Sequence, residues 1–378
     1  MKKIMIAISA AALLLAACTA QKPQEAALLS PADFDGEVDG KPVALYTLKG
    51  GNVILQVTNF GARVATIFTP DKDGNMVDVV LGRANLNDYV NYPGERFLGA
   101  CVGPVANRIG NASFEIDGVT YNVPKNDHDV NTLHGGFTGL DMVVWDVVAC
   151  DDNSITLHYC HKDMEEGYPG NLDITMKYTV TENSEFKIDY LATTDKKTHC
   201  NISNHPFFNL SGEGVGDILD YDMYINADAI VPIDALSIPT GEIMPVEGTP
   251  FDFREIHKIG ERINTEGDEQ LKNAKGYDHN WCLNKAAEGL TYACSVYNPA
   301  NGIFLEVLTD QPGIQFYSGN FFDGSGSGKY GTPLNFRASL ALETQCYPDT
   351  PNQPSFPSTI LEPGQEYHHT CVYRFSVK

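Results

Sequence analysis

The stretch Phe114-Glu115-Ile116-Asp117-Gly118-Val119-Thr120-Tyr121 shows the pattern that governs most of this sequence. Apolar and polar side chains alternate on either side of Asp117-Gly118, as is typical of strands with one buried face. Asp-Gly is a favoured two-residue hairpin turn because both positions tolerate positive φ angles. The stretch therefore predicts two antiparallel strands joined by a tight turn.

Similar segments recur outward from this hairpin in both directions. From residue 42 onward, short runs rich in β-branched and aromatic residues alternate with turns of Gly, Asn and Asp. Many short strands predict an all-β sandwich or barrel. No Gly-rich phosphate loop follows a strand, which disfavours nucleotide-binding α/β folds. The strands are expected at residues 43–48, 53–58, 64–68, 142–148, 155–160, 172–180, 186–192, 222–225, 292–297, 303–308 and 371–377.

Helical stretches are few and short, and the best candidate, Arg254 to Ala274, is mostly polar. The sequence after residue 40 contains neither an internal repeat nor a low-complexity linker. All-β folds often exceed about 200 residues as one unit. We therefore expect residues 41–378 to form a single domain.

The first 40 residues have a different character. Two lysines precede an apolar run, Ile4 to Ala17, which is too short for a stable bilayer span and is typical of a secretory signal. Its ending, Leu15-Ala16-Ala17-Cys18, resembles the lipobox of bacterial lipoproteins. We expect residues 1–17 to be a signal peptide and residues 18–40 a tether with a lipid on Cys18. An ordinary signal peptide or a buried N-terminal helix is the alternative.

This reading places the protein in the bacterial cell envelope, lipid-anchored at the periplasmic or outer-membrane face. The chain is strongly acidic, with a net charge of −23 from 49 acidic and 26 basic residues. Such a surface repels phosphate groups, so we expect no nucleic-acid partner and membrane contact only through Cys18. A neutral small molecule is not repelled, and a monomer is compatible with this composition.

Eight cysteines remain besides Cys18, and none form a Cys-x-x-Cys pair, which argues against zinc-ribbon and thioredoxin-like sites. The even count permits disulfides in an oxidising compartment, but a domain of this size does not need them. Most of the eight lie in apolar strand-like runs, which favours buried free thiols. They occupy positions 101, 150, 160, 200, 282, 294, 346 and 371.

Six polar clusters interrupt the apolar rhythm, and buried polar side chains are costly unless they are hydrogen-bonded. Glu343 stands out, because a carboxylate that follows Leu340, Ala341 and Leu342 needs a partner or carries a raised pKa. A structural ion pair explains this residue equally well on composition alone. The clusters are residues 103–110, 131–136, 204–210, 276–281, 311–320 and 340–345.

Six strings within these clusters occur in a fixed order. They are Asn-Arg-Ile (107–109), Thr-Leu-His-Gly-Gly (132–136), Asn-His-Pro-Phe-Phe-Asn-Leu (204–210), Tyr-Asp-His-Asn-Trp (277–281), Pro-Gly-Ile-Gln-Phe-Tyr-Ser-Gly-Asn (312–320) and Leu-Ala-Leu-Glu-Thr-Gln (340–345). In order and approximate spacing they resemble the aldose 1-epimerase (galactose mutarotase) family, here in a bacterial lipoprotein form. The resemblance covers residues 41–378, including a C-terminal signature at 348–358.

This resemblance implies a large twisted β-sandwich, the galactose mutarotase-like supersandwich, with an open sugar cleft and neither cofactor nor metal. It implies that His205 is the general acid and Glu343 the general base. Sugar hydroxyls and the ring oxygen would be held by Arg108, His134 and Asp278, with Asn107 and Gln315 as further members of the lining.

Two positions depart from the family pattern. Pro206 stands where Ser or Thr is usual, and Cys346 stands where His or Asn is usual. Neither is a catalytic position, so both bear on sugar preference more than on activity. The sugar itself stays open among galactose, glucose and pentoses such as arabinose or xylose.

The residue types suit the interconversion of α and β anomers of a free aldose. One proton leaves the C1 hydroxyl and one reaches the ring oxygen, so the ring opens; rotation about C1–C2 and closure reverse both transfers. A carboxylate and an imidazole both titrate near neutral pH after modest shifts. Nothing is oxidised and no group is transferred, so the reaction needs no cofactor.

Three other functions fit less well. A glycoside hydrolase uses two carboxylates, whereas the strings supply one carboxylate and one histidine. A non-catalytic sugar-binding lipoprotein of the same fold has no need of an acid–base pair. Metal sites at His158 with His161, or His368 with His369, are disfavoured because such neighbours on a strand diverge, and residues 71–75 lack the distal Glu of a calcium loop.

Overall fold

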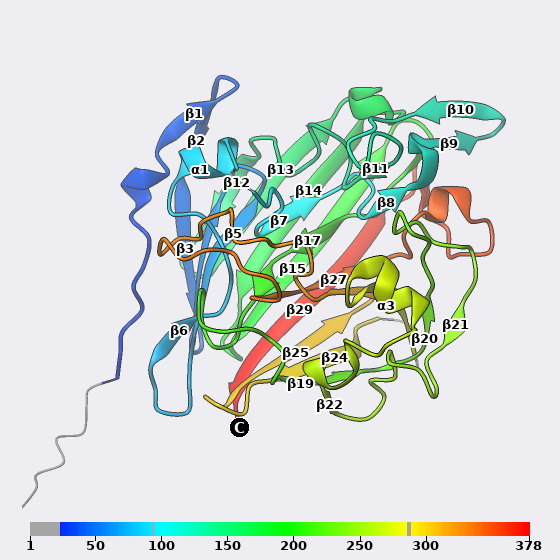
Figure 1. Cartoon of the computed structure of the whole chain (residues 1–378). Helices are drawn as coiled ribbons and strands as arrows, with labels where there is room; N and C mark the ends of the chain where they lie inside the picture. The colour runs from blue at the N-terminus through cyan, green and yellow to red at the C-terminus, as the bar shows by residue number, and fades with distance from the viewer. Residues whose placement is uncertain (1–22, 93, 286–288) are drawn as a thin grey trace, which may run out of the picture.

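Three antiparallel sheets carry the fold in the computed structural model, which describes residues 23–92, 94–285 and 289–378 (Figure 1). The predicted signal peptide and Cys18 lie outside the described residues. The largest sheet has nine strands in the order β12-β13-β14-β15-β29-β25-β24-β19-β22. These span Asp146–Cys150, Ser154–His161, Leu172–Val180, Glu185–Thr194, Tyr367–Val377, Ile303–Thr309, Thr291–Tyr297, Asp222–Ile225 and His257–Lys258.

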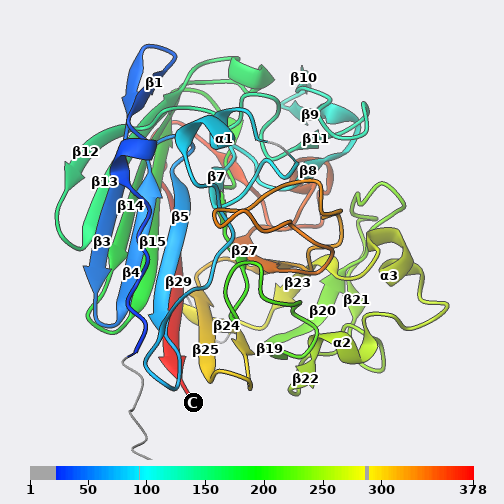
Figure 2. The same cartoon turned by 60° about the vertical axis from the view of Figure 1, so that its left-hand side comes forward.

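Two smaller sheets pack against this nine-stranded sheet and complete the sandwich (Figure 2). One has six strands in the order β18-β27-β26-β23-β20-β21, at Phe207–Phe208, Leu340–Gln345, Gly313–Tyr317, Asp278–Leu283, Ala227–Val231 and Met244–Pro245. The other has four strands, β3 to β6, at Leu45–Gly50, Val53–Thr58, Arg63–Pro70 and Met76–Asp78.

One hydrophobic core joins the three sheets, and its fully buried members include Leu55, Tyr178, Trp281 and Leu342. A buried hydrogen bond of 2.8 Å from the Tyr373 hydroxyl to the Leu342 carbonyl links β29 to β27 across the core. The predicted all-β sandwich is therefore confirmed.

The hairpin at residues 114–121 is also confirmed. Strands β9 (Ser113–Ile116) and β10 (Val119–Asn122) pair with Ile116 opposite Val119, and Asp117 and Gly118 have φ angles of 51° and 80°. The hairpin forms a two-stranded sheet of its own outside the large sheets. Its strands are short because they cover only the local cluster around Phe114.

Two sequence predictions of elements were wrong in detail. Residues 254–274 contain two short helices, α2 (Ile259–Arg262) and α3 (Glu269–Ala274), because a turn at Gly267 breaks the segment and Asp268 caps a new helix through the Leu271 N–H. Strand β12 begins at Asp146, four residues later than predicted. The preceding residues turn around Trp145, whose indole N–H donates to the Leu140 carbonyl.

The segment that the sequence assigns to a tether lies partly against the sandwich. The Gln24 carbonyl accepts a hydrogen bond from the Met76 N–H, Phe34 is fully buried, and β1 (Gly36–Val38) pairs with β2 (Lys41–Val43).

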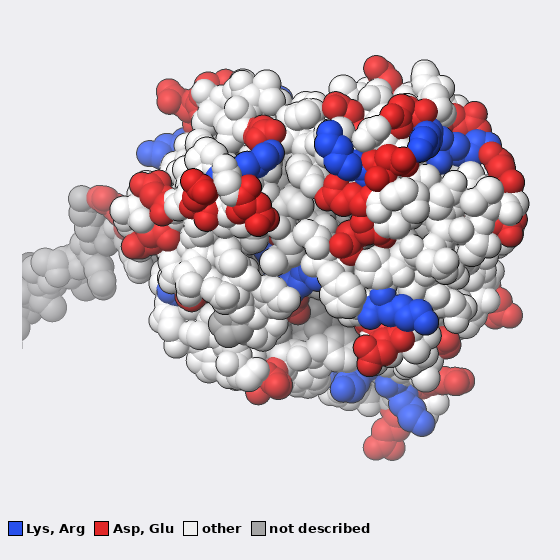
Figure 3. Space-filling model, turned by 90° about the horizontal axis from the view of Figure 1, so that it is seen from above, with Lys and Arg blue, Asp and Glu red and all other residues white. Residues whose placement is uncertain are grey.

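No helix among the described residues is long and apolar enough to cross a bilayer. Acidic side chains outnumber basic ones over the face shown in Figure 3.

The predictions for thiols and metals meet mixed outcomes. All eight described cysteines are free, but only five are buried; Cys150 is exposed, and Cys160 and Cys282 are partly exposed. His161 and His369 are buried, whereas His158 and His368 face solvent, so neither pair converges. Residues 71–75 form a turn, in which the Asp71 carboxylate accepts four hydrogen bonds from Asp73 and Asn75.

Buried histidines predict loss of stability in acid. Burial lowers the pKa of His161, His199 and His369 to about 4, and of His205 and His279 to about 3. The unfolded chain binds these protons near pH 6.5 and the folded chain does not, so stability is present above pH 6.5 and falls between 6.5 and about 4. Each histidine contributes a slope of about 1.4 kcal/mol per pH unit, which buried carboxyl groups of raised pKa partly oppose.

Denaturant unfolding followed by circular dichroism from pH 7 to 4 measures this slope. His161 gives the sharpest test, because neither of its ring nitrogens has a hydrogen-bond partner among the described residues. His161→Leu is expected to flatten the profile, with His368→Leu on the solvent face as the comparison variant. Equal slopes in wild type and His161→Leu would contradict the lowered pKa of His161.

Candidate active site

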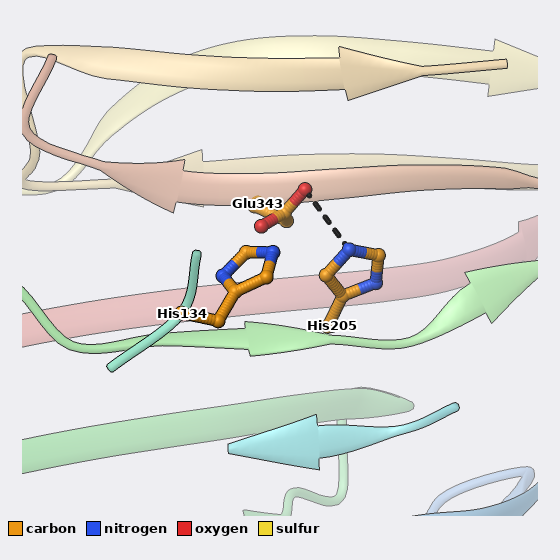
Figure 4. A group of neighbouring side chains, drawn as sticks. All are labelled: His134, His205 and Glu343. Atoms are coloured by element: carbon orange, nitrogen blue, oxygen red, sulfur yellow. Dashed lines mark ion pairs between the residues drawn. The ribbon is translucent and has the colours of Figure 1, made fainter. Parts of the chain in front are cut away.

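Two neighbouring strands bring His205 and Glu343 together (Figure 4). His205 ends β17 (Ser203–His205) and Glu343 lies in the middle of β27. The Nε2 atom of His205 is 3.3 Å from Oε1 of Glu343, and both side chains are almost fully buried. The two residues that the sequence singles out for proton transfer are thus in direct contact.

The register of the six-stranded sheet explains why Glu343 leaves the core. Glu343 lies opposite Gln315 on β26, and Leu342 lies opposite Phe316. Successive side chains on a strand point to opposite faces. Leu342 and Phe316 enter the hydrophobic core, so Glu343 faces the other side. Here the sheet presents polar groups, including Asp278 on β23.

A cavity of about 260 Å³ lies over this polar face. Of the seven predicted site residues, the structure gathers six on its wall: Asn107, Arg108, His134, His205, Asp278 and Glu343. Gln315 is not on the wall; its side-chain amide lies behind and donates to Asp278 at 2.7 Å. The second carboxyl oxygen of Glu343 is buried with no hydrogen-bond partner among the described residues, which leaves it available to a ligand.

Arg108 is held between two carboxylates. Its Nε is 3.1 Å from Asp127 and its Nη1 is 3.9 Å from Asp278. Strand β8 (Arg108–Ile109) places it by pairing with β11 (Thr132–Leu133), the strand that leads into His134. Burial raises the pKa of Asp278, and the charge of Arg108 opposes this shift. The guanidinium is therefore fixed in direction and presents its donors to the cavity.

The protonation of His134 is set by the backbone. Its Nδ1 accepts a hydrogen bond of 3.1 Å from the Asn107 N–H, and burial lowers its pKa well below the ordinary value. The neutral ring therefore carries its proton on Nε2. Both residues adopt positive φ angles, 62° for Asn107 and 51° for His134, a cost that is common at functional sites. His134 is thus a preset hydrogen-bond donor.

The same hydrogen bond bears on metal binding. Ligand atoms of His134, His205 and Glu343 all lie within 4.8 Å of one another, a spacing that two histidines and a carboxylate use for metals. A metal ligand must offer a lone pair, however, and Nε2 of His134 carries the proton because its Nδ1 is an acceptor. This donor set does not fit a resident metal ion.

Burial acts on both members of the central pair. It lowers the pKa of His205 to about 3, and it raises the pKa of Glu343 well above the ordinary value, an effect that the charge of Asp278 strengthens. Both shifts oppose the charged forms, so the pair favours a neutral imidazole beside a protonated carboxyl group. The pair holds one proton that either residue can carry.

Several residues of the cavity wall lie outside the six strings, and others lie within them but have no role implied by the resemblance. Phe97 packs against His134 at 4.6 Å between ring centroids and lies in an irregular segment with no pattern. Tyr317 lines the cavity, whereas Trp281 and Phe208, two other aromatic residues of the strings, are fully buried in the core. The full set without an assigned catalytic or binding role is Glu95, Phe97, Asp127, His128, Leu133, Phe207, Tyr317 and Phe321.

Comparison with known proteins supplies relatives over most of the chain. The sequence profile described as Aldose 1-epimerase matches residues 44–374. Galactose mutarotase of Rattus norvegicus is 40% identical over 338 residues, which are 89% of this chain and 95% of that protein. Aldose 1-epimerase of Escherichia coli K12 is 36% identical over 341 residues, 89% of this chain and 96% of that protein.

Solved structures agree with these sequence matches. The GalM/aldose epimerase homologue of C. elegans superposes with a TM-score of 0.81 at 29% identity, covering 89% of this chain and 99% of that one. Galactose 1-epimerase of Lactobacillus acidophilus gives a TM-score of 0.78 at 29% identity, covering 90% and 97%. The similarity therefore extends over the whole sandwich that carries the cavity.

Proposed function

This chain belongs to the aldose 1-epimerase family of isomerases, and from that premise we propose that it interconverts the α and β anomers of a free aldose through His205 and Glu343. The observation that carries the proposal is the contact of 3.3 Å between these two side chains in the wall of the cavity. At about 260 Å³ the cavity falls just below the range of about 300–1,000 Å³ for drug-sized ligands, which suits one sugar ring.

The proposed ring opening moves one proton onto the pair and one off it. Glu343, as a carboxylate, takes the proton of the C1 hydroxyl, while His205, as an imidazolium, gives its proton to the ring oxygen. The pair ends as a carboxylic acid beside a neutral imidazole, the arrangement that burial favours. After rotation about C1–C2, closure returns both protons. The net charge of the pair does not change at any step.

Three further wall residues hold the sugar. The preset Nε2–H of His134 and the guanidinium of Arg108 donate to sugar oxygens and stabilise negative charge that develops during opening. Asp278 accepts from a sugar hydroxyl, steadied by the Gln315 amide behind it. Such directed groups select sugars whose hydroxyls match them.

Polarimetry on freshly dissolved single anomers tests this function. A panel of α-galactose, α-glucose, arabinose and xylose also identifies the preferred aldose, because the relatives' names include galactose but the geometry does not choose a sugar. Catalysed approach to the equilibrium rotation supports the proposal. Calorimetric binding of the same sugars with no acceleration would favour the alternative, a sugar-binding protein without catalysis.

The pH profile follows from the central pair. Because the pKa of His205 is lowered to about 3, the pair gains a second proton only far below the ordinary histidine value of 6.5. We expect kcat/KM, corrected for the uncatalysed rate, to show no acid inflection near pH 6.5 as long as the protein is folded. Polarimetric rates from pH 8 to 5 with parallel circular dichroism check this. An inflection near 6.5 that His134→Gln retains would contradict the state assigned to His205.

We also propose that the protein is a lipoprotein anchored through Cys18 in the bacterial cell envelope. The support is the basic start, the short apolar run and the Leu15-Ala16-Ala17-Cys18 ending. The family profile matches residues 44–374, so this segment lies outside the matched region. Membrane fractionation and mass spectrometry of the mature N-terminus test the proposal, with Cys18→Ala as the control. A soluble wild-type protein without acyl groups would refute it.

A further inference from the structure

Four carboxyl groups line the sugar cavity, and the mechanism uses only some of them. They belong to Glu95, Asp127, Asp278 and Glu343. Asp127 and Asp278 hold Arg108, the one lysine or arginine among the described wall residues. Glu343 is paired with a histidine. Glu95 is left over, and nothing in the proton transfers accounts for it.

The surroundings of Glu95 give it only partial compensation. Its Oε1 accepts a hydrogen bond of 2.8 Å from the Phe97 N–H. Within the described part of the chain, no Lys, Arg or His nitrogen lies within the 4 Å of an ion pair. Burial raises the pKa of this carboxyl group, and the Phe97 N–H and the charges of Arg83 and Arg63 oppose this shift. A carboxylate on a cavity wall that no cation contacts directly can accept a hydrogen bond from a ligand, and a shifted pKa in a cavity is typical of functional residues.

The neighbouring charges define what this carboxylate would select. Burial raises the pKa of Tyr317 on the same wall, and the charges of Glu95 and Asp278 add to this shift, so both carboxylates act on groups that line the cavity. A sugar hydroxyl can donate to such a carboxylate, and an ammonium group can do so with added charge attraction. A carboxylate or phosphate on the sugar would instead meet like charge.

Resting on the proposed function, we propose that Glu95 is a specificity-determining residue of the sugar cavity. Its carboxylate accepts a hydrogen bond from a sugar substituent away from C1, which the central pair occupies. Through this contact the cavity accepts neutral aldoses and protonated amino sugars and rejects uronates. Glu95 takes no part in moving protons, so its effect falls on sugar binding and selection.

Glu95→Gln tests this directly, because glutamine keeps an oxygen for the Phe97 N–H and removes only the charge. The substrates are the aldose preferred in the panel, its 2-amino and 6-amino derivatives, and its uronate. We expect Glu95→Gln to lower kcat/KM for the amino sugars relative to the uronate by about tenfold or more. KM for the neutral aldose is expected to rise, while its kcat stays close to that of wild type.

Asp129→Asn is the matched control, since Asp129 is an exposed carboxylate in the loop that carries Asp127 and is not on the cavity wall. It changes the net charge equally and is expected to leave the ratio unchanged. A ratio that is the same in wild type, Glu95→Gln and Asp129→Asn would overturn the inference, and Glu95 would then serve only to hold Phe97.

Failure of the Glu95 inference can be distinguished from failure of the proposed function. Were wild type to accelerate no sugar, the proposed function would fall, and calorimetric binding of the amino sugar and the uronate would still decide the role of Glu95. Tighter binding of the amino sugar that Glu95→Gln abolishes supports the inference. Equal binding of both sugars to wild type overturns it. Catalysis of the neutral aldose with an unchanged ratio defeats the Glu95 inference alone.

Discussion

Glu343→Gln and His205→Asn are each expected to slow mutarotation of a pure anomer by about 10²–10⁴-fold, the range that a positioned acid or base contributes. Glutamine cannot take the proton of the C1 hydroxyl, and asparagine cannot give one to the ring oxygen at neutral pH. The double variant is expected to be little slower than either single variant, because the two residues handle one shared proton and act as a unit. Polarimetry on a freshly dissolved anomer measures all three rates.

The stability of these variants separates chemistry from folding. A buried carboxyl group with a raised pKa destabilises the folded state as pH rises through that pKa, so stability is greatest below the ordinary pKa of 4.5 and is lost above it. Glu343→Gln removes this cost and is expected to unfold at the same temperature as wild type or higher at pH 7. Gln315→Ala, which alters a neighbouring side chain outside the cavity wall, is the comparison variant for the unfolding temperature. A near-normal rate in folded Glu343→Gln or His205→Asn would refute the assigned roles.

Lys329→Met is expected to destabilise the fold by about 3–5 kcal/mol, as is typical when one partner of a buried ion pair is removed. The Lys329 side chain is fully buried, with Nζ 3.1 Å from Asp78 and 3.3 Å from Glu213. It also donates to the carbonyls of Ala65 and Val80 at 2.9 and 2.6 Å. Methionine fills the space and leaves two buried carboxylates without a cation. Urea unfolding at pH 7 measures the loss.

Two further variants show whether burial causes this effect. Lys258→Met removes an exposed pair with Asp220 at 3.0 Å, and it is expected to cost less than about 1 kcal/mol. The triple variant Lys329→Met, Asp78→Asn, Glu213→Gln removes the whole charge cluster and is expected to recover part of the stability. The loop between β26 and β27, residues 318–339, carries Lys329. If Lys329→Met lowered the free energy of unfolding no more than Lys258→Met does, the buried charge cluster would not be what stabilises this loop.

Much of the fold was predictable because its signals are local. The alternation in β14 survives in the structure, where even positions from Leu172 to Val180 are buried and those between them are more open. The strings around His205 and Glu343 also led to the site. Acid–base catalysis needs a histidine and a carboxylate at particular positions, and both residues can be read from the sequence.

Other parts depend on contacts between distant segments and leave no local signal. Lys329 lies in a run of Gly and Ser that is typical of an exposed loop, yet its amine reaches the Ala65 carbonyl across 264 positions of sequence. Glu95 lies in irregular chain before Phe97, so no periodicity marks its approach to the cavity. Gln315 was expected among the lining, and the structure shows its amide donating to Asp278, a contact between two strands that no local pattern marks.

The shared proton of His205 and Glu343 has a consequence for how turnovers follow one another. Under the proposed roles, ring closure restores the starting arrangement of the pair, so the catalyst resets itself without drawing on bulk water. Turnover then needs no proton from the buffer, so the enzymatic rate is expected to be independent of buffer concentration. Such a catalyst works equally well in dilute, weakly buffered surroundings.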